Sequence, residues 1–291
     1  TDSSGVVSFT LKPGAYSLGV RLRDAMDTIS GVTIKPNTVT RETAGLGSGT
    51  LQVRVETTPG HPAVGAEVQV YRGRTSVAAN FTNQSGMISF TINAGTYTLQ
   101  TALGNATGPV TTVQVNSGAV ARATIVLNTG TLQVQVDMAP GHPAYAAEVQ
   151  IYRGSTSVAS NFTDHSGMIA FTLNAGAYTA RTALGEATGS VATIQVHSGA
   201  VAKATSILHA GTLVVKVLTK SGQPMNGATV AVYEGTTYVT TAYTDSTGEA
   251  SFILKSGSYN VLVSQGATKN KPLSLKVAEG GTGEYTVRLG T

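Results

Sequence analysis

The stretch TNQSGMISFTINAGTYTL, residues 82–99, decides the fold of this chain. Apolar and polar residues alternate after each of its two turn signals, NQSG and NAG, and alternation of this kind predicts half-buried β-strands. Related stretches begin at Thr1, Thr163 and Thr244 with TDSSG, TDHSG and TDSTG. The strand–turn–strand pattern therefore recurs every 81 residues along the chain.

A second marker repeats with the same period. The tripeptide Gly-Thr-Leu begins at residues 49, 130 and 211. A period of 81 residues is longer than the roughly 20–50 residues of solenoid repeats, and it suits a small domain with its own core. We therefore predict a partial unit at residues 1–48 and complete units at residues 49–129, 130–210 and 211–291.

Residues 49–129 indicate how one unit folds. Leu51, Val53 and Val55 alternate with polar residues along the first strand. Seven short strands of this kind, separated by turn signals, predict an antiparallel β-sandwich of the immunoglobulin-like or prealbumin-like type. No window has a sustained helical period, so we expect no helix. The expected core residues are Val53, Phe90, Leu99 and Ile125, with their counterparts 81 positions on.

The joins between units are short. Residues 128–131 alone separate Leu127, which ends one unit, from Leu132, which begins the core of the next. No proline-rich or glycine/serine-rich linker is present. We expect neighbouring units to contact each other in a semi-rigid array, to which each adds about 35–40 Å.

The composition is typical of β-structure with many turns. Glycine accounts for 34 of the 291 residues and charged residues for only 12%. The net charge of +4 is spread over the chain and no unit is strongly basic, which argues against nucleic-acid binding. The absence of cysteine excludes disulfides and thiolate metal sites. No apolar stretch approaches the roughly 20 residues needed to span a bilayer.

An acidic or amide residue occupies the second position of each TDSSG-like motif. Asp2, Asp164 and Asp245 each precede a glycine by three residues, and Asn83 takes this place in one unit. A Ca²⁺ site would need further clustered carboxylates, which the sequence lacks there. The pattern instead indicates an Asx turn that shapes a hairpin, with the glycine at positive φ.

Two aromatic positions recur in the same motif. We expect the tyrosine ring to pack at the sandwich edge and its hydroxyl to bond to backbone, as in a tyrosine corner. We expect the phenylalanine in the core. These residues are Tyr16, Tyr97, Tyr178 and Tyr259, and Phe9, Phe90, Phe171 and Phe252. With no tryptophan, the chain gives little support to a carbohydrate-stacking platform.

The five histidines do not form a metal-binding pattern. His61 and His142 lie in a repeated PGHPA loop, which places one histidine in each loop, whereas a metal site needs two or three converging ligands. His165, His197 and His209 are scattered among turns and strand ends. No nucleophile elbow or phosphate-binding glycine loop occurs. We therefore predict no catalytic, cofactor-binding or metal-binding residue.

The string TDxSGxxxFxLxxGxYxL, together with GTLxVxV…GxPxxGAxVxVY at Gly211–Tyr233, resembles carboxypeptidase regulatory-like and Cna B-type domains. These are prealbumin-like β-sandwiches, and the resemblance recurs in every unit of the chain. It implies a stalk, spacer or assembly module of a bacterial surface protein.

Some Cna B-type domains carry a Lys–Asn isopeptide bond beside an acidic residue, and this sequence departs from that pattern. Residues 49–129 contain no lysine, and Lys203 lies in the last strand of its unit instead of the first. Lys216 lies in a first strand, but the last strand of its unit, EYTVRL, contains no Asn or Asp. We predict no such cross-link in any unit.

These features favour a non-catalytic structural stalk, spacer or filament at a bacterial cell surface or outside the cell. Its partners would be neighbouring repeats and copies of itself in a fibre. The alternative is an adhesin that binds a host or matrix ligand through loops such as PGHPA and NATG, with its affinity concentrated in one unit. A third reading is an appendage that holds a catalytic domain away from a surface.

Residues 1–48 correspond to the last four strands of a unit, so one side of their core would lie open. Open apolar faces and unpaired strand edges invite association. We expect Phe9, Leu11 and Tyr16 to be covered, either by sequence upstream in a longer native chain, which we favour, or by a strand of another molecule.

Overall fold

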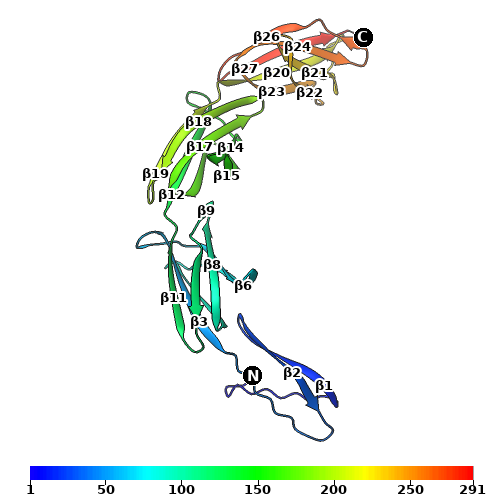
Figure 1. Cartoon of the computed structure of the whole chain (residues 1–291). Coiled ribbons are helices and arrows are strands. Elements are labelled where there is room, and N and C mark those ends of the chain that lie inside the picture. Colours follow the sequence, from blue (N-terminus) through cyan, green and yellow to red (C-terminus); the bar gives the residue numbers. More distant parts are fainter. Residues whose placement is uncertain (291) are drawn as a thin grey trace. The chain divides into compact units, whose positions relative to one another are not determined.

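The computed structural model describes residues 1–290, apart from the side chain of Ala192. The chain forms two compact units, Thr1–Asn128 and Thr129–Thr291. All regular structure in the described residues is β-strand, which confirms the predicted all-β class (Figure 1). Accordingly, this part of the chain contains no helix that could cross a membrane.

The first unit holds a hairpin, β1 (Gly14–Leu22) with β2 (Ala25–Ile34), and one sandwich. One sheet of the sandwich has the strand order β10-β8-β5-β6, with the short β9 beside β8. In the other sheet, β3 pairs with β11, with β7 and with the short β4. The sandwich strands are β3 (Ser48–Thr58), β4 (His61–Pro62), β5 (Glu67–Arg72), β6 (Thr75–Phe81), β7 (Met87–Asn93), β8 (Gly95–Leu103), β9 (Ala106–Thr107), β10 (Thr111–Val115) and β11 (Val120–Val126).

The second unit holds two sandwiches of the same design. The strands of one are β12 (Thr129–Ala139), β13 (His142–Pro143), β14 (Glu148–Arg153), β15 (Thr156–Phe162), β16 (Met168–Asn174), β17 (Gly176–Leu184), β18 (Ala187–Val196) and β19 (Val201–Ile207). Those of the other are β20 (Ala210–Thr219), β21 (Thr229–Glu234), β22 (Thr237–Tyr243), β23 (Glu249–Lys255), β24 (Gly257–Gln265), β25 (Thr268–Lys269), β26 (Leu273–Val277) and β27 (Thr282–Leu289). The exact unit boundaries given above stay a prediction.

The predicted sandwich is confirmed with one correction to its strand directions. The last strand of each sandwich runs parallel to the first, in the pairs β11 with β3, β19 with β12 and β27 with β20. The other pairs in the described residues are antiparallel. Alternating burial looks the same in both directions, so the sequence pattern could not reveal the parallel pair.

The expected core residues are buried. Val53, Phe90, Leu99 and Ile125 are at most 3% exposed. Their counterparts in the second unit are buried as well: Val134, Phe171, Ala180 and Ser206, and Val215, Phe252, Val261 and Val287. Each sandwich thus encloses its own core between its two sheets.

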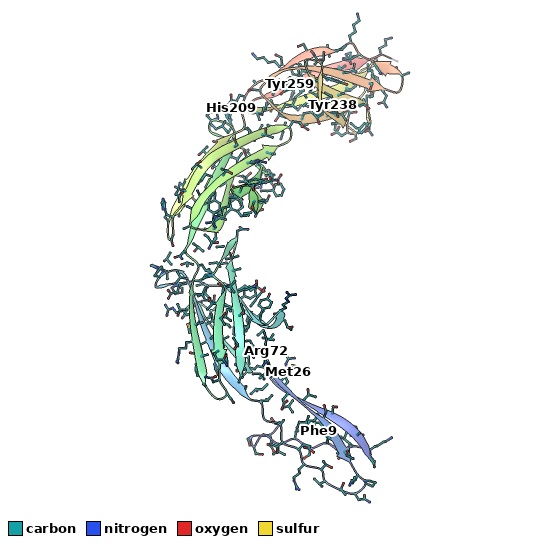
Figure 2. The ribbon with its side chains drawn as sticks, viewed as in Figure 1. Phe9, Met26, Arg72, His209, Tyr238 and Tyr259 are labelled. Atoms are coloured by element: carbon teal, nitrogen blue, oxygen red, sulfur yellow. The ribbon has the colours of Figure 1, made fainter. Side chains whose placement is uncertain are left out.

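Residues 1–48 form only two of the four expected strands. The segments equivalent to Val6–Leu11 in the other repeats are β7, β16 and β23, which pair with β3, β12 and β20. Residues 1–48 contain no counterpart of those partner strands, so Val6–Leu11 remain without sheet pairing. Phe9 is 63% exposed and Leu11 43%, so the expected cover is not supplied within this chain (Figure 2).

The tip of the β1–β2 hairpin docks on the neighbouring sandwich of its unit. Ala25 at this tip is fully buried. The Met26 amide donates to Asn93 Oδ1 at 3.2 Å, and Asn93 Nδ2 donates to the Met26 carbonyl at 2.8 Å. Figure 2 places Met26 at this end of the hairpin.

A corresponding joint connects the two sandwiches of the second unit. At the tip between β17 and β18, the Glu186 amide donates to the Ile253 carbonyl of β23 at 3.0 Å. The Ser256 amide donates to the His209 carbonyl at 2.7 Å, and His209 Nδ1 lies 2.9 Å from Glu279 Oε1. The hairpin tip therefore serves as a contact between repeats in both units.

Candidate functional site

The aspartate of the repeated motif is the acceptor of a tight turn. Asp164 Oδ1 accepts the backbone N–H of Ser166 at 2.8 Å and of Met168 at 3.0 Å, and it accepts the Ser166 hydroxyl at 2.6 Å. The Ser166 hydroxyl bond, followed by the Met168 amide, lowers the pKa of Asp164 below its ordinary value. Asp2, Asn83 and Asp245 accept the equivalent backbone N–H groups, and Asp2 and Asp245 also accept the hydroxyl bond. These bonds agree with the predicted Asx turn, in which the side-chain oxygen accepts backbone N–H groups of the next residues.

The glycine of this motif has a positive φ, as predicted, and it also has a packing role. Gly86 has φ +69°, and a Cβ there would lie 2.5 Å from the Val55 carbonyl oxygen. The turn between β6 and β7 therefore packs directly against the backbone of β3, and no larger residue fits.

The threonine that opens the motif has a role that the sequence analysis missed. Thr163 is 3% exposed; its hydroxyl donates to the Ala144 carbonyl and accepts the Ala147 amide, whose nitrogen lies 2.9 Å away. Thr82 and Thr244 make the equivalent pair of bonds. This hydroxyl fixes the loop before β5, β14 or β21 to the strand end. The signal for this role in the sequence was the recurrence of threonine at the first position of every motif.

The predicted tyrosine corner is present in all four copies. The Tyr97 hydroxyl donates to the Asn93 carbonyl at 2.6 Å and that of Tyr178 to the Asn174 carbonyl at 2.7 Å. Tyr16 and Tyr259 bond likewise to the carbonyls of Lys12 and Lys255 at 2.9 Å. Burial raises the pKa values of Tyr97, Tyr178 and Tyr259, which keeps their hydroxyls as donors.

The histidines have different neighbours. His61 Nδ1 lies 2.9 Å from the Thr58 hydroxyl. His165 stacks on Tyr145 with ring centroids 4.0 Å apart, and His209 faces Glu279. His142 lies in β13, and His197 is exposed after β18. Within the described residues, no group of three or more His, Asp or Glu could hold a metal ion.

Lys216 has an acidic neighbour but no partner for an isopeptide bond on the last strand. Its Nζ lies 2.8 Å from Glu249 Oε1, and this hydrogen bond raises the pKa of Lys216. The residue opposite Lys216 on β27 is Thr286. Lys203 lies on β19, opposite Gln133. The absence of isopeptide cross-links remains a prediction.

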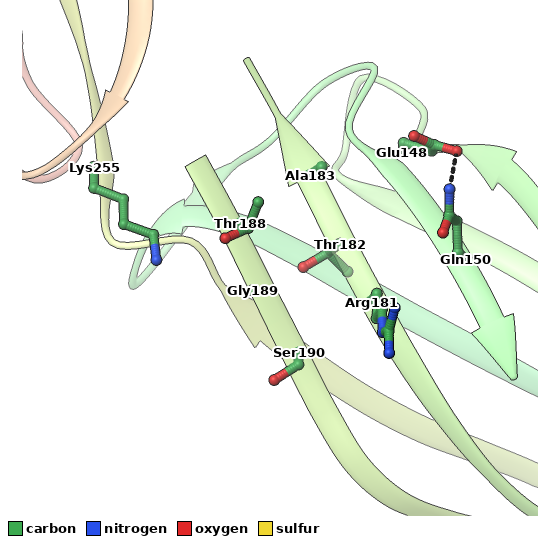
Figure 3. A pocket seen from close by; sticks show the side chains of 9 residues that line it. All are labelled: Glu148, Gln150, Arg181, Thr182, Ala183, Thr188, Gly189, Ser190 and Lys255. Carbon is green, nitrogen blue, oxygen red and sulfur yellow. Dashed lines mark hydrogen bonds between the residues drawn. The ribbon is translucent and has the colours of Figure 1, made fainter. Parts of the chain in front are cut away.

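A cavity of about 490 Å³ lies on the second unit, where the outer face of β14, β17 and β18 meets the next sandwich (Figure 3). It is lined by charged and polar residues of these strands and by Lys255 from the end of β23. A second depression of about 340 Å³ lies beside Phe162, at the ends of β15 and β16. The sequence analysis named neither, because their residues are far apart in the chain.

Comparison with protein families gives a match for one repeat. Residues 212–290 match the model of the carboxypeptidase regulatory-like domain. The resemblance stated from the motif is therefore confirmed here. No curated protein matches the sequence of the chain.

Several solved structures are similar in part. They include the Bacillus anthracis TIE protein (18% identity, TM-score 0.28, covering 84% of this chain and 51% of that one) and a streptococcal ancillary pilin (13%, TM-score 0.32, covering 84% and 99%). The shaft pilin SpaA from Lactobacillus rhamnosus GG is 10% identical, with a TM-score of 0.32, and 56% of this chain and 97% of that one are covered. The chain thus spans about half the length of the TIE protein.

Proposed function

We propose that this chain is a non-catalytic structural array, a stalk, spacer or filament component of a bacterial cell surface. The proposal is carried by one observation: the recurring polar residues of the motif bond to the backbone of their own sandwich. Asp164 shapes a turn, Thr163 fixes a loop and Tyr178 closes a corner, and each is bonded to backbone. The recurring polar residues of the motif thus maintain the sandwich.

Contacts between successive sandwiches support the same function. The hairpin tips at Ala25 and Glu186 bind the next sandwich within their units through backbone hydrogen bonds and burial. A spacer needs joints that resist bending, and short joins with specific bonds provide resistance without a flexible linker.

Electron microscopy of the native material tests this proposal. Rods or fibres with a repeat near the expected 35–40 Å per unit would support it. Compact globules, or a particle with a bound catalytic subunit, would contradict it. Protease treatment of intact bacteria tests the surface location. We expect the protease to cleave the chain on intact cells. Cleavage only after the cells are broken would exclude a surface role.

A second candidate, an adhesin, is favoured by the cavity beside Lys255. Affinity in an adhesin is expected to concentrate in one repeat, and the combination of Arg181 and Lys255 at one joint is not repeated. The residues 81 positions before Arg181 and Lys255 are Gln100 and Asn174.

A further inference from the structure

The cavity beside Lys255 presents two positive side chains on opposite walls. Arg181 lies on β17, within the first sandwich of the second unit. Lys255 belongs to the next sandwich, and Figure 3 shows its side chain reaching toward Thr188 on β18. The lining also includes Gly189 and Ser190 of β18.

Neither cation has a counter-ion among the described residues, and the Arg181 side chain packs on a ring. The Arg181 guanidinium lies over the Tyr152 ring, 4.8 Å from its centroid, and this packing leaves the N–H edge of the group open. The backbone of Lys255 is fixed by the Tyr259 hydroxyl at 2.9 Å. Among the described residues, neither Arg181 nor Lys255 forms a salt bridge.

The acidic group of the cavity already has protein partners. Glu148 Oε1 accepts Gln150 Nε2 at 2.7 Å and the Ser160 hydroxyl at 3.2 Å. The cavity therefore combines two unpaired cations, one engaged carboxylate and hydroxyl groups of Thr188 and Ser190. Its volume falls within the roughly 300–1,000 Å³ of small-molecule sites.

We propose that this cavity binds a sugar unit carrying a carboxylate or sulfate group, within an acidic polysaccharide. Arg181 would bind the anionic group through two N–H donors, and Lys255 would contribute a second charge from the opposite wall. Thr188 and Ser190 can exchange hydrogen bonds with sugar hydroxyls. The opening on the sheet surface suits an internal unit of a polymer, because the chain can enter and leave along the face.

The proposal goes beyond the structural role, since a ligand here would contact both sandwiches of the second unit. It does not depend on fibre formation, so the array and the binding site can fail separately. The probes below distinguish a site for a free anion from a site for an anionic sugar.

Calorimetric titration of the full chain tests the site with four probes: a heparin tetrasaccharide, a galacturonate tetramer, maltotetraose and inorganic sulfate. We expect at least one acidic tetrasaccharide to bind, with no binding of maltotetraose and at least tenfold weaker binding of sulfate. If sulfate binds as tightly as the saccharides, the site is an anion site only and the proposal fails. Tighter binding of a glutamate oligopeptide would also overturn it.

The variants follow substitutions that the chain itself contains. Arg181→Gln and Lys255→Asn introduce the residues found 81 positions earlier, and each should weaken saccharide binding about tenfold or more, as expected for a lost charge-assisted bond. Glu148→Gln should strengthen it, because a negative charge is removed. Lys203→Gln, the same loss of charge on β19 in the other sheet, is the matched control and should leave binding unchanged. If Lys203→Gln weakened saccharide binding equally, the binding would reflect general attraction to positive charge, and the proposed site would be contradicted.

Discussion

Thr101 and Thr182 occupy equivalent positions, and their hydroxyls have different surroundings. Both residues are at most 4% exposed. The hydroxyl oxygens of Thr182 and Ser206 are 2.7 Å apart, but Ile125 stands where Ser206 would be in the first sandwich. Thr101 Oγ1 therefore has no hydrogen-bond partner among the described residues. A buried hydroxyl without a partner costs about 1–3 kcal/mol.

Thr101→Val should therefore stabilise the chain by about 1 kcal/mol, because valine has the same shape and no hydroxyl to desolvate. Thr182→Val is the control and should destabilise by a similar amount, since it leaves Ser206 unpaired. Denaturant unfolding of both variants measures the difference. A loss of stability in Thr101→Val would show that this hydroxyl has a partner in solution.

The Asp164 turn should make stability depend on pH. Bonds from Ser166 and Met168 lower the pKa of Asp164 in the folded chain, so its contribution is present above the unfolded pKa and is lost as pH falls through the folded one. Asp164→Asn introduces the residue found at position 83, whose Oδ1 accepts the same backbone bonds. We expect wild type to melt higher at neutral pH, with the gap closing below about pH 4. Melting curves from pH 7 to pH 2 check this, and a gap independent of pH would contradict it.

Local features of the site could be predicted from the sequence and long-range ones could not. The Asx turn and the tyrosine corner connect residues four apart or closer, so their spacing is visible in the motif. The Thr163 hydroxyl reaches residues 16 and 19 positions away, and the Arg181–Lys255 cavity joins different repeats. Such pairs depend on how sheets and sandwiches pack, which periodicity alone does not specify.

At the scale of strands, β7 and β6 place similar aromatic residues in opposite environments. Phe90 is 3% exposed and packs in the core, whereas Phe81 is 61% exposed at the end of β6. Phe90→Ala should cost about 3–5 kcal/mol of unfolding free energy, because it leaves a cavity. Phe81→Ala is the matched control and should change stability by less than about 0.5 kcal/mol. A cost below about 1 kcal/mol for Phe90→Ala would show that the ring is not in the core.

The alternation of apolar and polar residues predicted which segments form strands, but it did not predict which strands pair with each other. The strand predicted after the NQSG turn corresponds to β7, and Leu51, Val53 and Val55 of β3 are fully buried, as their alternation predicts. The same pattern placed a strand at Val6–Leu11, which has high apolar content but no partner to pair with. A strand needs a neighbour for its backbone groups, so a correct local pattern is insufficient where the described residues supply no neighbouring strand.

For the whole molecule, we expect stability to be independent of divalent ions. The described residues contain no group that could hold a metal, and the motif carboxylates accept backbone bonds instead. Melting with and without a chelator such as EDTA should give the same temperature. A fall of more than about 2 °C would indicate a bound ion and would reopen the aspartate turns as ligands.

The joint between the two sandwiches of the second unit should protect specific amides from exchange. The Glu186 amide bonds to Ile253 of the next sandwich, and the Ser256 amide bonds to His209 in the join between the two sandwiches. Inserting Gly-Ser-Gly after His209 should separate these groups, because the added residues remove the constraint of the short join. Amide hydrogen exchange should then become fast at Glu186 and Ser256 while the strand interiors stay protected. The same insertion after Gly154, in an open turn between β14 and β15, is the control and should leave both amides slow. If Glu186 exchanges equally fast in wild type and in the variant with the insertion after His209, the sandwiches are not coupled in solution, and the semi-rigid joint on which a spacer depends is absent.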